Sequence, residues 1–452
     1  MKFFGRENDL AELRKIREAS KTQSRMTVVT GRRRIGKTRL ILESLAGEEY
    51  LYFFVTRQDE QLLCAQFVEQ LSRVLGIDVY QPYTEFRNVF RFLMELAHTR
   101  HINLVIDEFQ EFTRINPAIY GFVQQYWDLN KDKAKINLIL SGSVQTQMVR
   151  IFDSYQEPLY GRASAKFFIG PLSVATLHEI MHAYAPNYTA FDFLTLYAIT
   201  GGVPYYVEVL ADDQALSYDL ILKHLLKHQS IFLPEGNFLL VQEFGKDYGT
   251  YFSVLALIAN GQTTRGKIES VLQRPVGGYL TKLKDEYQII DRLRPVFSKE
   301  GTTNVRYFID DNFLRFWFRF IHKYDGPIET RNFAYVRQII DRDFKTFAGP
   351  ILEKLIRQKL AESHQFSHIG NYWERGNQNE IDVIAYNELT KKAVIGEVKM
   401  DPRNVSIDVL RLKAQEIIRK LSGYEVKYQS FSLQDVLKEP IAGQKNGQNP
   451  EQ

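Results

Sequence analysis

Apolar and polar positions over residues 1–172 follow a pattern that predicts short strands separated by helices. Five apolar runs, each of a length suited to one buried strand, occur at residues 26–30, 49–55, 102–106, 136–140 and 166–169. The segments between them have helical patterns, for example at residues 39–45 and 61–75. Apolar strands that alternate with helices are typical of a parallel α/β sheet buried on both faces.

The pattern changes after residue 171. Residues 171–240 are mostly helical, with a break at Gly201, Gly202, Val203 and Pro204. Three short helices at 251–260, 264–272 and 278–287 and two strand-like runs at 288–293 and 304–309 then favour a winged helix. Residues 311–323 (DNFLRFWFRFIHK) are aromatic and basic, and we expect them to face a core.

The last part of the chain predicts a further α/β domain. A helix at 347–361 precedes strands and a hairpin, and residues 439–452 have the composition of a disordered tail. We therefore expect five parts. They are a sheet domain over 1–172, a helical lid over 173–244, a winged helix over 245–325, an α/β domain over 335–438 and a tail over 439–452.

Composition narrows the class of protein only a little. Hydrophobic residues make up 44% and charged residues 25%, and the net charge of +4 permits nucleic-acid binding without requiring it. The one cysteine, Cys64, excludes an intramolecular disulfide and a cysteine-based zinc site, which fits a reducing cytoplasm. Neither a signal peptide nor a membrane span is predicted, so we expect a cytoplasmic protein.

The loop after the first strand matches the phosphate-binding pattern G-x-x-x-x-G-K-[ST] at every fixed position. It reads Gly31, Arg32, Arg33, Arg34, Ile35, Gly36, Lys37 and Thr38, and Arg39 follows at the start of a helix. The glycines let backbone N–H groups point at phosphate oxygens, Lys37 supplies a charge to the β- and γ-phosphates, and the Thr38 hydroxyl can ligate Mg²⁺. The loop therefore predicts ATP or ADP as a ligand.

Two acids end a later apolar strand. Asp107 can hold Mg²⁺, directly or through water, and Glu108 can polarise the attacking water. An ordinary helix N-cap is the alternative for such a pair. Ser141 or Ser143, after the fourth strand, could contact the γ-phosphate or the water, and an ordinary turn is an equal alternative. Arg162 is a candidate charge donor to the γ-phosphate, or else a surface arginine.

These features together resemble the archaeal-type prokaryotic ATPases, a branch of the AAA+/STAND P-loop group with a C-terminal restriction-endonuclease-like domain of unknown function. The resemblance is carried by Phe4-Gly5-Arg6-Glu7, GRRRIGKT, LVIDE, LSGS, PLYGR, Gly201–Pro204, FLRFWFRF and the C-terminal acids. It implies that Phe4, Gly5 and Arg6 lie near the adenine and that Ser141 or Ser143 is a sensor. It also implies that Gly201–Pro204 begins the lid and that Arg162 is an arginine finger, in cis or across a subunit contact.

Residues 261–310 carry nine Lys or Arg against six Asp or Glu. Lys282 and Lys284 are the exposed candidates of a recognition helix, but Asp285 and Glu286 interrupt that face. In the STAND group a winged helix often packs against the ATPase instead. DNA contact and a packing module therefore both stay open.

The C-terminal segment carries a D…E-x-K pattern. Asp382 lies on one predicted strand, and Glu397 and Lys399 share one face of the next. Two carboxylates can bind Mg²⁺ and an adjacent lysine can position or deprotonate water, as in restriction-type nucleases. Glu353, on the preceding helix, would add a further acid. An exposed charged hairpin and a Glu353–Arg357 helix ion pair are the alternatives.

The fold expected is an α/β P-loop NTPase with a parallel, AAA+/STAND-like sheet, a helical lid, a winged-helix domain and a C-terminal α/β PD-(D/E)XK nuclease-like domain. The function expected is an ATP-hydrolysing, Mg²⁺-dependent switch that controls binding or cutting of nucleic acid by the later domains. Its partners would be ATP or ADP, DNA and further copies of the chain. The rivals are a regulator or scaffold with an inactive nuclease-like domain and a nucleotide-gated protein-interaction switch.

Overall fold

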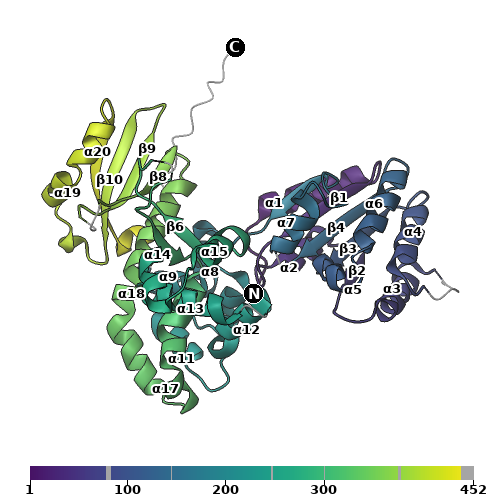
Figure 1. Ribbon diagram of the computed structural model, residues 1–452, viewed down its shortest axis with the longest axis horizontal. Coiled ribbons are helices and arrows are strands. Elements are labelled where there is room, and N and C mark those ends of the chain that lie inside the picture. Colours follow the sequence, from purple (N-terminus) through teal and green to yellow (C-terminus); the bar gives the residue numbers. More distant parts are fainter. Residues whose placement is uncertain (78–82, 144, 246–247, 300, 375–377, 439–452) are drawn as a thin grey trace. The chain divides into compact units, whose positions relative to one another are not determined.

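The computed structural model describes residues 1–452 except 78–82, 144, 246–247, 300, 375–377 and 439–452, so the predicted tail lies outside the described residues. The chain forms two compact units (Figure 1). The N-terminal unit consists of residues 3–171 with 203–205, and the C-terminal unit consists of residues 1–2, 172–202 and 206–452. In the described part of the chain, no helix combines the length and apolarity needed to cross a membrane.

A five-stranded sheet is the centre of the N-terminal unit, with strand order β2-β3-β4-β1-β5. The strands are β1 (Arg25–Thr30), β2 (Leu51–Phe54), β3 (Ile102–Asp107), β4 (Ile136–Gly142) and β5 (Ala165–Phe168). Every neighbouring pair is parallel, which confirms the predicted sheet. Because the strands are parallel, the residues that follow β1, β3 and β4 meet at one edge.

Helices connect the strands of this sheet. They are α1 (Glu7–Ser20), α2 (Lys37–Ser44), α3 (Glu60–Leu75), α4 (Phe86–Leu96), α5 (Phe112–Ile115), α6 (Ile119–Asn130), α7 (Gln145–Asp153) and the 3₁₀ turn η1 (Phe109–Glu111). Their apolar faces bury an aromatic cluster in which Phe67 stacks on Phe53 and Phe86 lies against Phe112. Cys64 is fully buried there, and burial raises the pKa of its thiol to about 12, as suits a structural residue.

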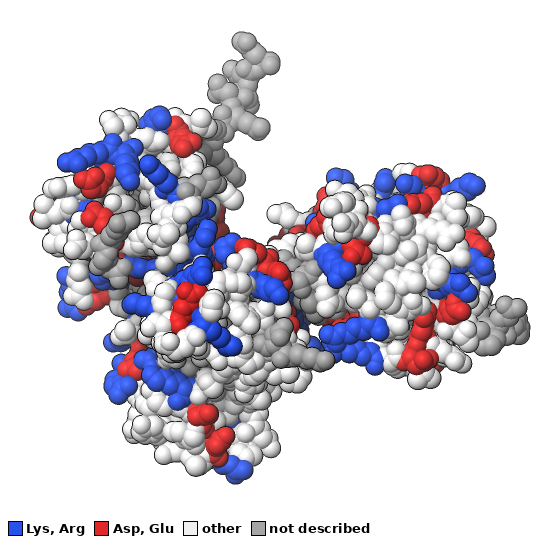
Figure 2. Space-filling model, viewed as in Figure 1, with Lys and Arg blue, Asp and Glu red and all other residues white. Residues whose placement is uncertain are grey.

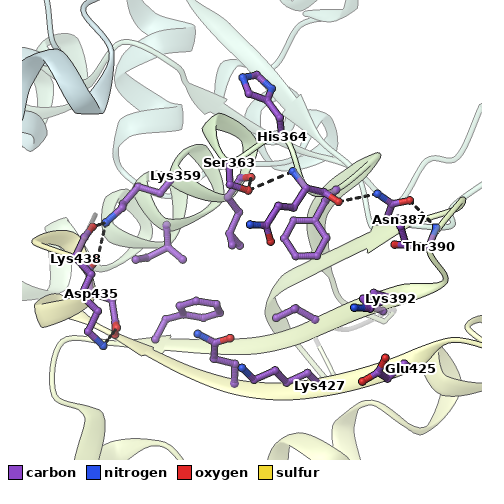
Figure 3. Close-up of a pocket in the computed structure, with 18 residues that line it drawn as sticks. Lys359, Ser363, His364, Asn387, Thr390, Lys392, Glu425, Lys427, Asp435 and Lys438 are labelled. Carbon is purple, nitrogen blue, oxygen red and sulfur yellow. Dashed lines mark hydrogen bonds and ion pairs between the residues drawn. The ribbon is translucent and has the colours of Figure 1, made fainter. Parts of the chain in front are cut away.

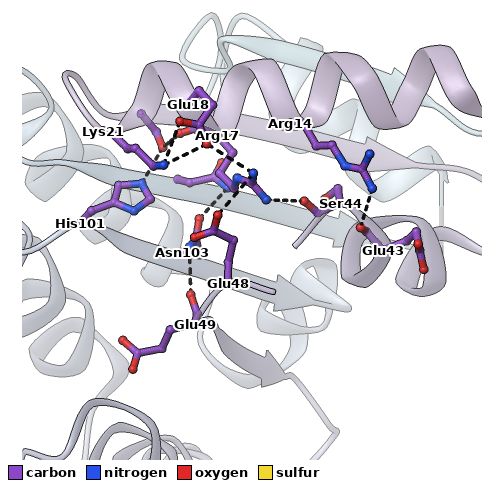
Figure 4. A network of polar contacts seen from close by, with 12 residues as sticks. Arg14, Arg17, Glu18, Lys21, Glu43, Ser44, Glu48, Glu49, His101 and Asn103 are labelled. Carbon is purple, nitrogen blue, oxygen red and sulfur yellow. Dashed lines mark hydrogen bonds and ion pairs between the residues drawn. The ribbon is translucent and has the colours of Figure 1, made fainter. Parts of the chain in front are cut away.

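Polar side chains of α1 hold the helix against α2 and β3 (Figure 4). Arg17 donates to the carbonyl of Ser44 at 2.8 Å and lies 3.4 Å from Glu48. The carbonyl oxygens at a helix end attract cations, so this contact ties α1 to the end of α2. The Ser20 hydroxyl contacts His101 at 2.8 Å, just before β3. These contacts fix the end of α1 relative to the helix that follows the glycine-rich loop.

The C-terminal unit begins with helices, as predicted. They are α8 (Val174–Tyr184), α9 (Ala190–Thr200), α10 (Pro204–Asp212), α11 (Tyr218–Leu225) and α12 (Phe232–Phe244). Next come α13 (Tyr248–Ala259), α14 (Arg265–Leu272), α15 (Gly277–Thr281), the π-helical turn η3 (Lys282–Glu286), and a two-stranded antiparallel sheet of β6 (Ile290–Leu293) and β7 (Arg306–Ile309).

The aromatic segment after β7 faces the core, as its pattern predicts. It forms α16 (Asn312–Phe316), the π-helical turn η4 (Trp317–Ile321) and the 3₁₀ turn η5 (His322–Tyr324), and α17 (Asp325–Glu329) follows. Phe313, Phe316, Phe318 and Phe320 are each at most 1% exposed. These phenylalanines therefore contribute to packing in the core.

One long helix, α18 (Phe333–Glu362), connects this core to the last sheet. It starts 14 residues before the helix that the pattern predicts. In these additional turns Val336, Ile340 and Phe344 continue the buried apolar face of the helix, which packs on other helices of the unit. The helix continues through Pro350 without a break. Glu353 consequently stands on an element that contacts both α9 and the strands β8 to β10.

The last sheet has four strands in the order β11-β10-β9-β8. They are β8 (His368–Tyr372), β9 (Ile381–Asn387), β10 (Lys392–Lys399) and β11 (Glu425–Ser432), with β10 antiparallel to β9 and parallel to β11. The helices α19 (Ile407–Lys413) and α20 (Gln415–Lys420) cover one face, and the 3₁₀ turns are η7 (Pro402–Asn404) and η8 (Leu433–Val436).

The connection between β6 and β7 packs on this last sheet. The Val296 N–H donates to the carbonyl of Asn371 in β8 at 2.8 Å, and the Phe297 ring stacks on Tyr386 in β9 with centroids 5.1 Å apart. After it, Arg306 forms an ion pair with Glu380 at 2.7 Å, two residues before Asp382. The hairpin is therefore attached to the strand that carries Asp382.

A half-buried histidine on α8, His178, makes the stability of the C-terminal unit depend on pH. His178 stacks on Phe193 with centroids 3.9 Å apart and contacts the Tyr188 hydroxyl at 2.7 Å. Burial, followed by the nearby Lys359 ammonium, lowers the pKa of His178 to about 4. In the unfolded chain this imidazole titrates near 6.5. Between these values the unfolded chain binds more protons, so stability rises with pH across the window and is lost as pH falls.

We expect His178→Gln to reduce this dependence. Between pH 7 and pH 4.5 the wild type should lose about 2 kcal/mol more stability than the variant, because only the wild type must keep a neutral imidazole buried. Thermal unfolding of the C-terminal unit, followed by calorimetry at both pH values, measures the difference. His182→Gln, on the same helix, is the control. An equal acid sensitivity of wild type and His178→Gln would contradict the assignment.

Candidate nucleotide-binding site and a second carboxylate cluster

The loop between β1 and α2 has the geometry of an anion cradle. Gly31 has φ 151° and a Cβ there would lie 2.4 Å from the carbonyl oxygen of Ile169, so no side chain fits. Gly36 has φ 84° and stands directly before α2. Lys37 is 7% exposed, and its ammonium donates to the carbonyls of Gly31 at 2.8 Å and Arg32 at 3.1 Å. The charge is thus held against the loop at the start of α2, where the helix dipole also favours an anion.

Asp107 lies at the end of β3 and gathers donors from three neighbouring elements. Its carboxylate accepts from the Thr38 hydroxyl of α2 at 2.9 Å, the Tyr52 hydroxyl of β2 at 2.5 Å and the Ser141 hydroxyl of β4. The side chain is 3% exposed. Burial, together with the negative charge of Asp107, raises the pKa of Tyr52, which therefore stays a donor. The predicted proximity of Thr38 and Asp107 is present in the structure.

Glu108 follows in a left-handed conformation, with φ 55°. Its carboxylate accepts from the Ser143 hydroxyl at 2.8 Å and from the Gln110 amide. Such a backbone conformation is costly for a residue other than glycine and is often found at functional sites. The two serines are thus distinguished by their contacts, because Ser141 reaches Asp107 and Ser143 reaches Glu108. Their roles as sensors stay predictions.

Segments far apart in the sequence complete the surroundings of the loop. Arg6 donates to the carbonyls of Gly170 and Ile35, which brings Phe4, Gly5 and Arg6 close to the loop. Arg39 lies over the Phe3 ring at 5.9 Å.

The segment of residues 203–205, which belongs to the same compact unit, packs on the loop. The guanidinium of Arg34 lies 4.0 Å from the centroid of the Tyr205 ring, and the Tyr205 N–H donates to the carbonyl of Arg34 at 3.4 Å. Pro204, the first residue of α10, would be 3.7 Å from a Cβ at Gly36. Arg34 and Gly36 are thus in contact with the first turn of a helix.

Arg162 does not join this site within its own chain. It precedes β5 at the amino edge of the sheet, whereas the loop follows β1 at the carboxyl edge. Its guanidinium forms an ion pair with Asp128 at 2.7 Å and donates to the carbonyl of Pro158. The expectation of a finger in cis is therefore wrong, because the parallel pairing of β1 and β5 separates the two ends. A role across a subunit contact stays a prediction.

Sequence reasoning did not identify Tyr52 and Gln110 as residues of this site. Tyr52 is one of several aromatic residues in β2, and Gln110 lies in the short turn η1 after the two acids. The position of Gln110, two residues after Glu108, is a weak signal that could have been used. No sequence signal distinguishes Tyr52 from Tyr50, because only the pairing of β2 with β3 places its hydroxyl on Asp107.

A second cluster lies in the C-terminal unit, at the predicted D…E-x-K residues. Gly396 pairs with Val383, so Glu397 and Asp382 are the next positions on the two antiparallel strands. The Lys399 ammonium is 2.9 Å from Glu397 and 3.6 Å from Asp382. Asp382 and Glu397 are 7% and 9% exposed, and the Val398 N–H donates to Asp382 at 2.8 Å. The three side chains that the pattern singled out are thus brought together.

Glu353 joins the cluster from α18. Arg357 lies 3.7 Å from its carboxylate and donates to the carbonyl of Asp382 at 2.7 Å. Burial and then the charge of Asp382 raise the pKa of Glu353 to about 7, and burial also raises the pKa of Asp382. Among the described residues, no three His, Cys, Asp or Glu side chains stand together as a ready metal site. The cluster therefore offers two adjacent carboxylates and a nearby third whose protonation is easily changed.

A cavity of about 950 Å³ opens on the other face of this sheet (Figure 3). It lies under the end of α18, and Ile356, Val394 and Phe431 contribute apolar walls. Lys359 closes one side by donating to the carbonyls of Asp435 and Val436. Because side chains alternate along a strand, the lining residue Val394 and the cluster residue Glu397 point to opposite faces of β10. The cavity is thus separate from the carboxylate cluster.

Comparison with known proteins gives two family matches. Residues 3–210 match a family described as "ATPase domain predominantly from Archaea", and residues 317–406 match one described as "Archaea bacterial proteins of unknown function". An uncharacterized protein of Methanocaldococcus jannaschii is 30% identical over 406 residues, which cover 88% of this chain and 87% of that protein.

Solved structures show a similar fold. The Walker-type ATPase of Pyrococcus abyssi is 18% identical, with a TM-score of 0.53 over 70% of this chain and 96% of that chain. The ORC2 protein of Aeropyrum pernix, solved as ADPNP-ADP complexes, is 14% identical with a TM-score of 0.47, covering 72% and 94%. The first likeness shows a parallel-sheet P-loop ATPase fold, to which this chain adds the C-terminal mixed sheet.

Proposed function

This chain belongs to the archaeal-type ATPase family, and we propose that it binds and hydrolyses Mg-ATP as a switch that controls its C-terminal domain. The observation that carries the proposal is the arrangement at the carboxyl edge of the first sheet. Asp107 is held against Thr38, and Glu108 is held separately by Ser143. This arrangement supports a role for one acid beside a cation and for the other beside the attacking water.

The binding part of this function follows from the loop. Its N–H groups and the Lys37 ammonium would bind the β- and γ-phosphates, and Phe4, Gly5 and Arg6 would lie toward the adenine. A magnesium ion fits beside Thr38 and Asp107, because Mg²⁺ prefers oxygen ligands and these two oxygens are already 2.9 Å apart. Bound Mg²⁺ would offset the charge of the transferring phosphoryl group.

The hydrolytic part rests on Glu108. A carboxylate that orients and deprotonates the attacking water must be held in one position. The Ser143 hydroxyl and the Gln110 amide hold the Glu108 carboxylate, while the Ser141 hydroxyl holds Asp107. Ser143 would thus act on the water and Ser141 on the cation.

Control of the C-terminal domain would begin at residues 203–205. Tyr205 and Pro204 contact Arg34 and Gly36, two positions of the loop that encloses the phosphates. Pro204 is also the first residue of α10, and α9 ends just before it. A γ-phosphate that changes the loop would therefore change the first turn of a lid helix.

Two substitutions test the ATPase. Lys37→Ala should weaken Mg-ATP binding about 10- to 100-fold, because a charge-assisted contact to phosphate is lost. Glu108→Gln should bind Mg-ATP within about twofold of wild type and lower kcat about 10²- to 10⁴-fold, the usual contribution of a general base. Calorimetric titration and phosphate release measure the two effects.

Lys15→Ala, on an exposed position of α1, is the control and should match wild type. If Lys37→Ala and Glu108→Gln both hydrolyse ATP at the wild-type rate, the site is wrongly assigned.

A second function, metal-dependent cleavage of nucleic acid, is favoured by the cluster of Asp382, Glu397 and Lys399. We propose that Asp382 and Glu397 hold a divalent cation and that Lys399 orients the attacking water. Both carboxylates are oxygen ligands on adjacent strands, which suits Mg²⁺ or Mn²⁺. Figure 2 shows Lys and Arg side chains over the part of the C-terminal unit that holds β8 to β11, with Asp and Glu side chains among them. Contact with a polyanion would therefore rest on individual lysines near the cluster.

Cleavage assays with Mn²⁺ and several DNA and RNA forms test this second function. Asp382→Ala should lower the rate at least about 100-fold, because one of two cation ligands is lost. Asp408→Ala, an exposed acid in the same domain, is the control. Equal inactivity of wild type and Asp382→Ala on every substrate would favour the rival function, a regulator or scaffold with an inactive domain.

The helices α13 to α15 and the β6–β7 hairpin support a winged helix, and we propose that it is a packing module. A wing that binds DNA must be free, but Val296 and Phe297 in this connection contact β8 and β9. Lys284 is paired with Asp285 at 2.7 Å, so one of the two candidate lysines is partly neutralised. The hairpin would then hold the last sheet in place while other residues bind DNA.

A gel-shift titration tests the packing module. Lys282→Glu with Lys284→Glu should change the affinity for duplex DNA by less than about twofold, whereas lost phosphate contacts would weaken it about tenfold or more. Phe297→Ser tests the packing contact itself. Loss of the Phe297 ring, which stacks on Tyr386, should loosen the last sheet and lower the protection of its amides from hydrogen exchange. A loss of DNA binding by the lysine variants alone would make the winged helix the DNA reader.

A further inference from the structure

A second lysine reaches the C-terminal cluster from an element that the D…E-x-K pattern does not include. Lys413 is the last residue of α19, 14 positions after Lys399, and its ammonium lies 3.2 Å and 3.4 Å from the two oxygens of Glu397. Glu397 therefore contacts two ammonium groups, because Lys399 lies 2.9 Å from the same carboxylate. The negative charge of Asp382 is offset by the Lys399 ammonium and by the backbone N–H of Val398.

The backbone of Lys413 is fixed, although its side chain is not enclosed. Leu410 and Ala414, on either side of it, are at most 1% exposed and pack in the core of this sheet. The Ser406 side chain caps the start of the helix. The Lys413 side chain is 29% exposed, compared with 12% for Glu397. Its ammonium can therefore turn from Glu397 to solvent without any change in the fold.

The two lysines are not equivalent in the proposed cleavage reaction. Lys399 lies within reach of both carboxylates, which suits the group that orients water. Among the described residues, the carboxylate that the Lys413 ammonium contacts is that of Glu397. When Glu397 is shared with a divalent cation, the attraction between Lys413 and that carboxylate weakens, since like charges repel at this distance. Lys413 is then a free ammonium beside the cleavage site.

We propose that Lys413 is a phosphate-binding residue of this site, which pairs with Glu397 in the free protein and binds a backbone phosphate of the nucleic acid when a cation is present. This inference rests on the proposed nuclease function. A lysine is a point charge with three donors and suits a phosphate oxygen. In the free protein the same ammonium offsets the charge of a buried carboxylate and so keeps Glu397 in place.

Binding of Mn²⁺ without nucleic acid gives the first measurement. Wild type and Glu397→Ala are both titrated with Mn²⁺ in a calorimeter. The binding that the wild type shows and Glu397→Ala lacks is assigned to this site. Lys413→Ala should bind Mn²⁺ at this site about three- to tenfold more tightly, because a competing cation is gone. Lys427→Ala, which removes a lysine from the opposite face of the sheet, should match wild type.

Affinity for a labelled DNA duplex with Ca²⁺, and cleavage with saturating Mn²⁺, give the second measurement. Lys413→Ala should bind the duplex about tenfold more weakly and should cleave it more slowly in proportion. Lys413→Arg should retain most of the affinity. If Lys413 binds phosphate, its removal should tighten Mn²⁺ binding and weaken DNA binding. If its role is purely structural, its removal should weaken the binding of both.

The outcomes separate the inference from the function on which it rests. If Lys413→Ala weakens Mn²⁺ binding, or matches Lys427→Ala with DNA while Asp382→Ala is inactive, Lys413 does not bind phosphate and the nuclease stands. If Glu397→Ala removes no Mn²⁺ binding and the wild type cleaves nothing, the proposed nuclease fails and the inference fails with it.

Discussion

The carboxylate of Asp107 is the contact on which the first site depends. It joins Thr38 at the start of α2, Tyr52 of β2 and Ser141 of β4, so one helix and two strands converge on one buried side chain. A buried carboxylate is tolerated only with such donors, because removing it from water is otherwise too costly. The same contacts that make Asp107 tolerable also fix the glycine-rich loop relative to the strand that carries Glu108.

The C-terminal cluster meets the same constraint in a different way. Asp382 and Glu397 are brought side by side by an antiparallel pair, and their repulsion is offset by Lys399, Lys413 and the Val398 N–H. Where Asp107 relies on hydroxyl donors, this pair relies on the ammonium groups of two lysines whose side chains are partly exposed. Hydroxyl donors hold a site rigid, whereas a lysine with an exposed side chain can leave its carboxylate when another cation arrives. The difference would suit the proposed nuclease, whose site would admit both a metal ion and a polyanion.

The sequence predicts whatever is set by strand order and alternation. Thr38, Asp107 and Ser141 could be expected together because carboxyl ends of parallel strands meet, and Asp382, Glu397 and Lys399 because alternation puts them on one face. Tyr52 and Lys413 could not be predicted as site residues. Tyr52 reaches Asp107 because β2 pairs with β3, and Lys413 reaches Glu397 because of where α19 packs on the sheet. The length of α18 was underestimated because its first half packs on helices while its second half packs on the sheet. Arg162 was misplaced because a motif gives the order of residues but not the edge of the sheet on which they stand.

The energy needed for the proposed switch is modest. Moving a two-state equilibrium from 1:99 to 99:1 requires about 5.5 kcal/mol of differential binding. Hydrogen bonds to a charged group contribute about 1.5–3 kcal/mol each, so about two to four contacts that only the γ-phosphate makes would be enough. The loop offers Lys37 and its backbone N–H groups, and residues 203–205 contact the same loop at Arg34 and Gly36. Only contacts that differ between ATP and ADP can drive such a change. In the proposed switch, the β-phosphate contacts would therefore set the affinity, and the γ-phosphate contacts would set the state of the lid helix.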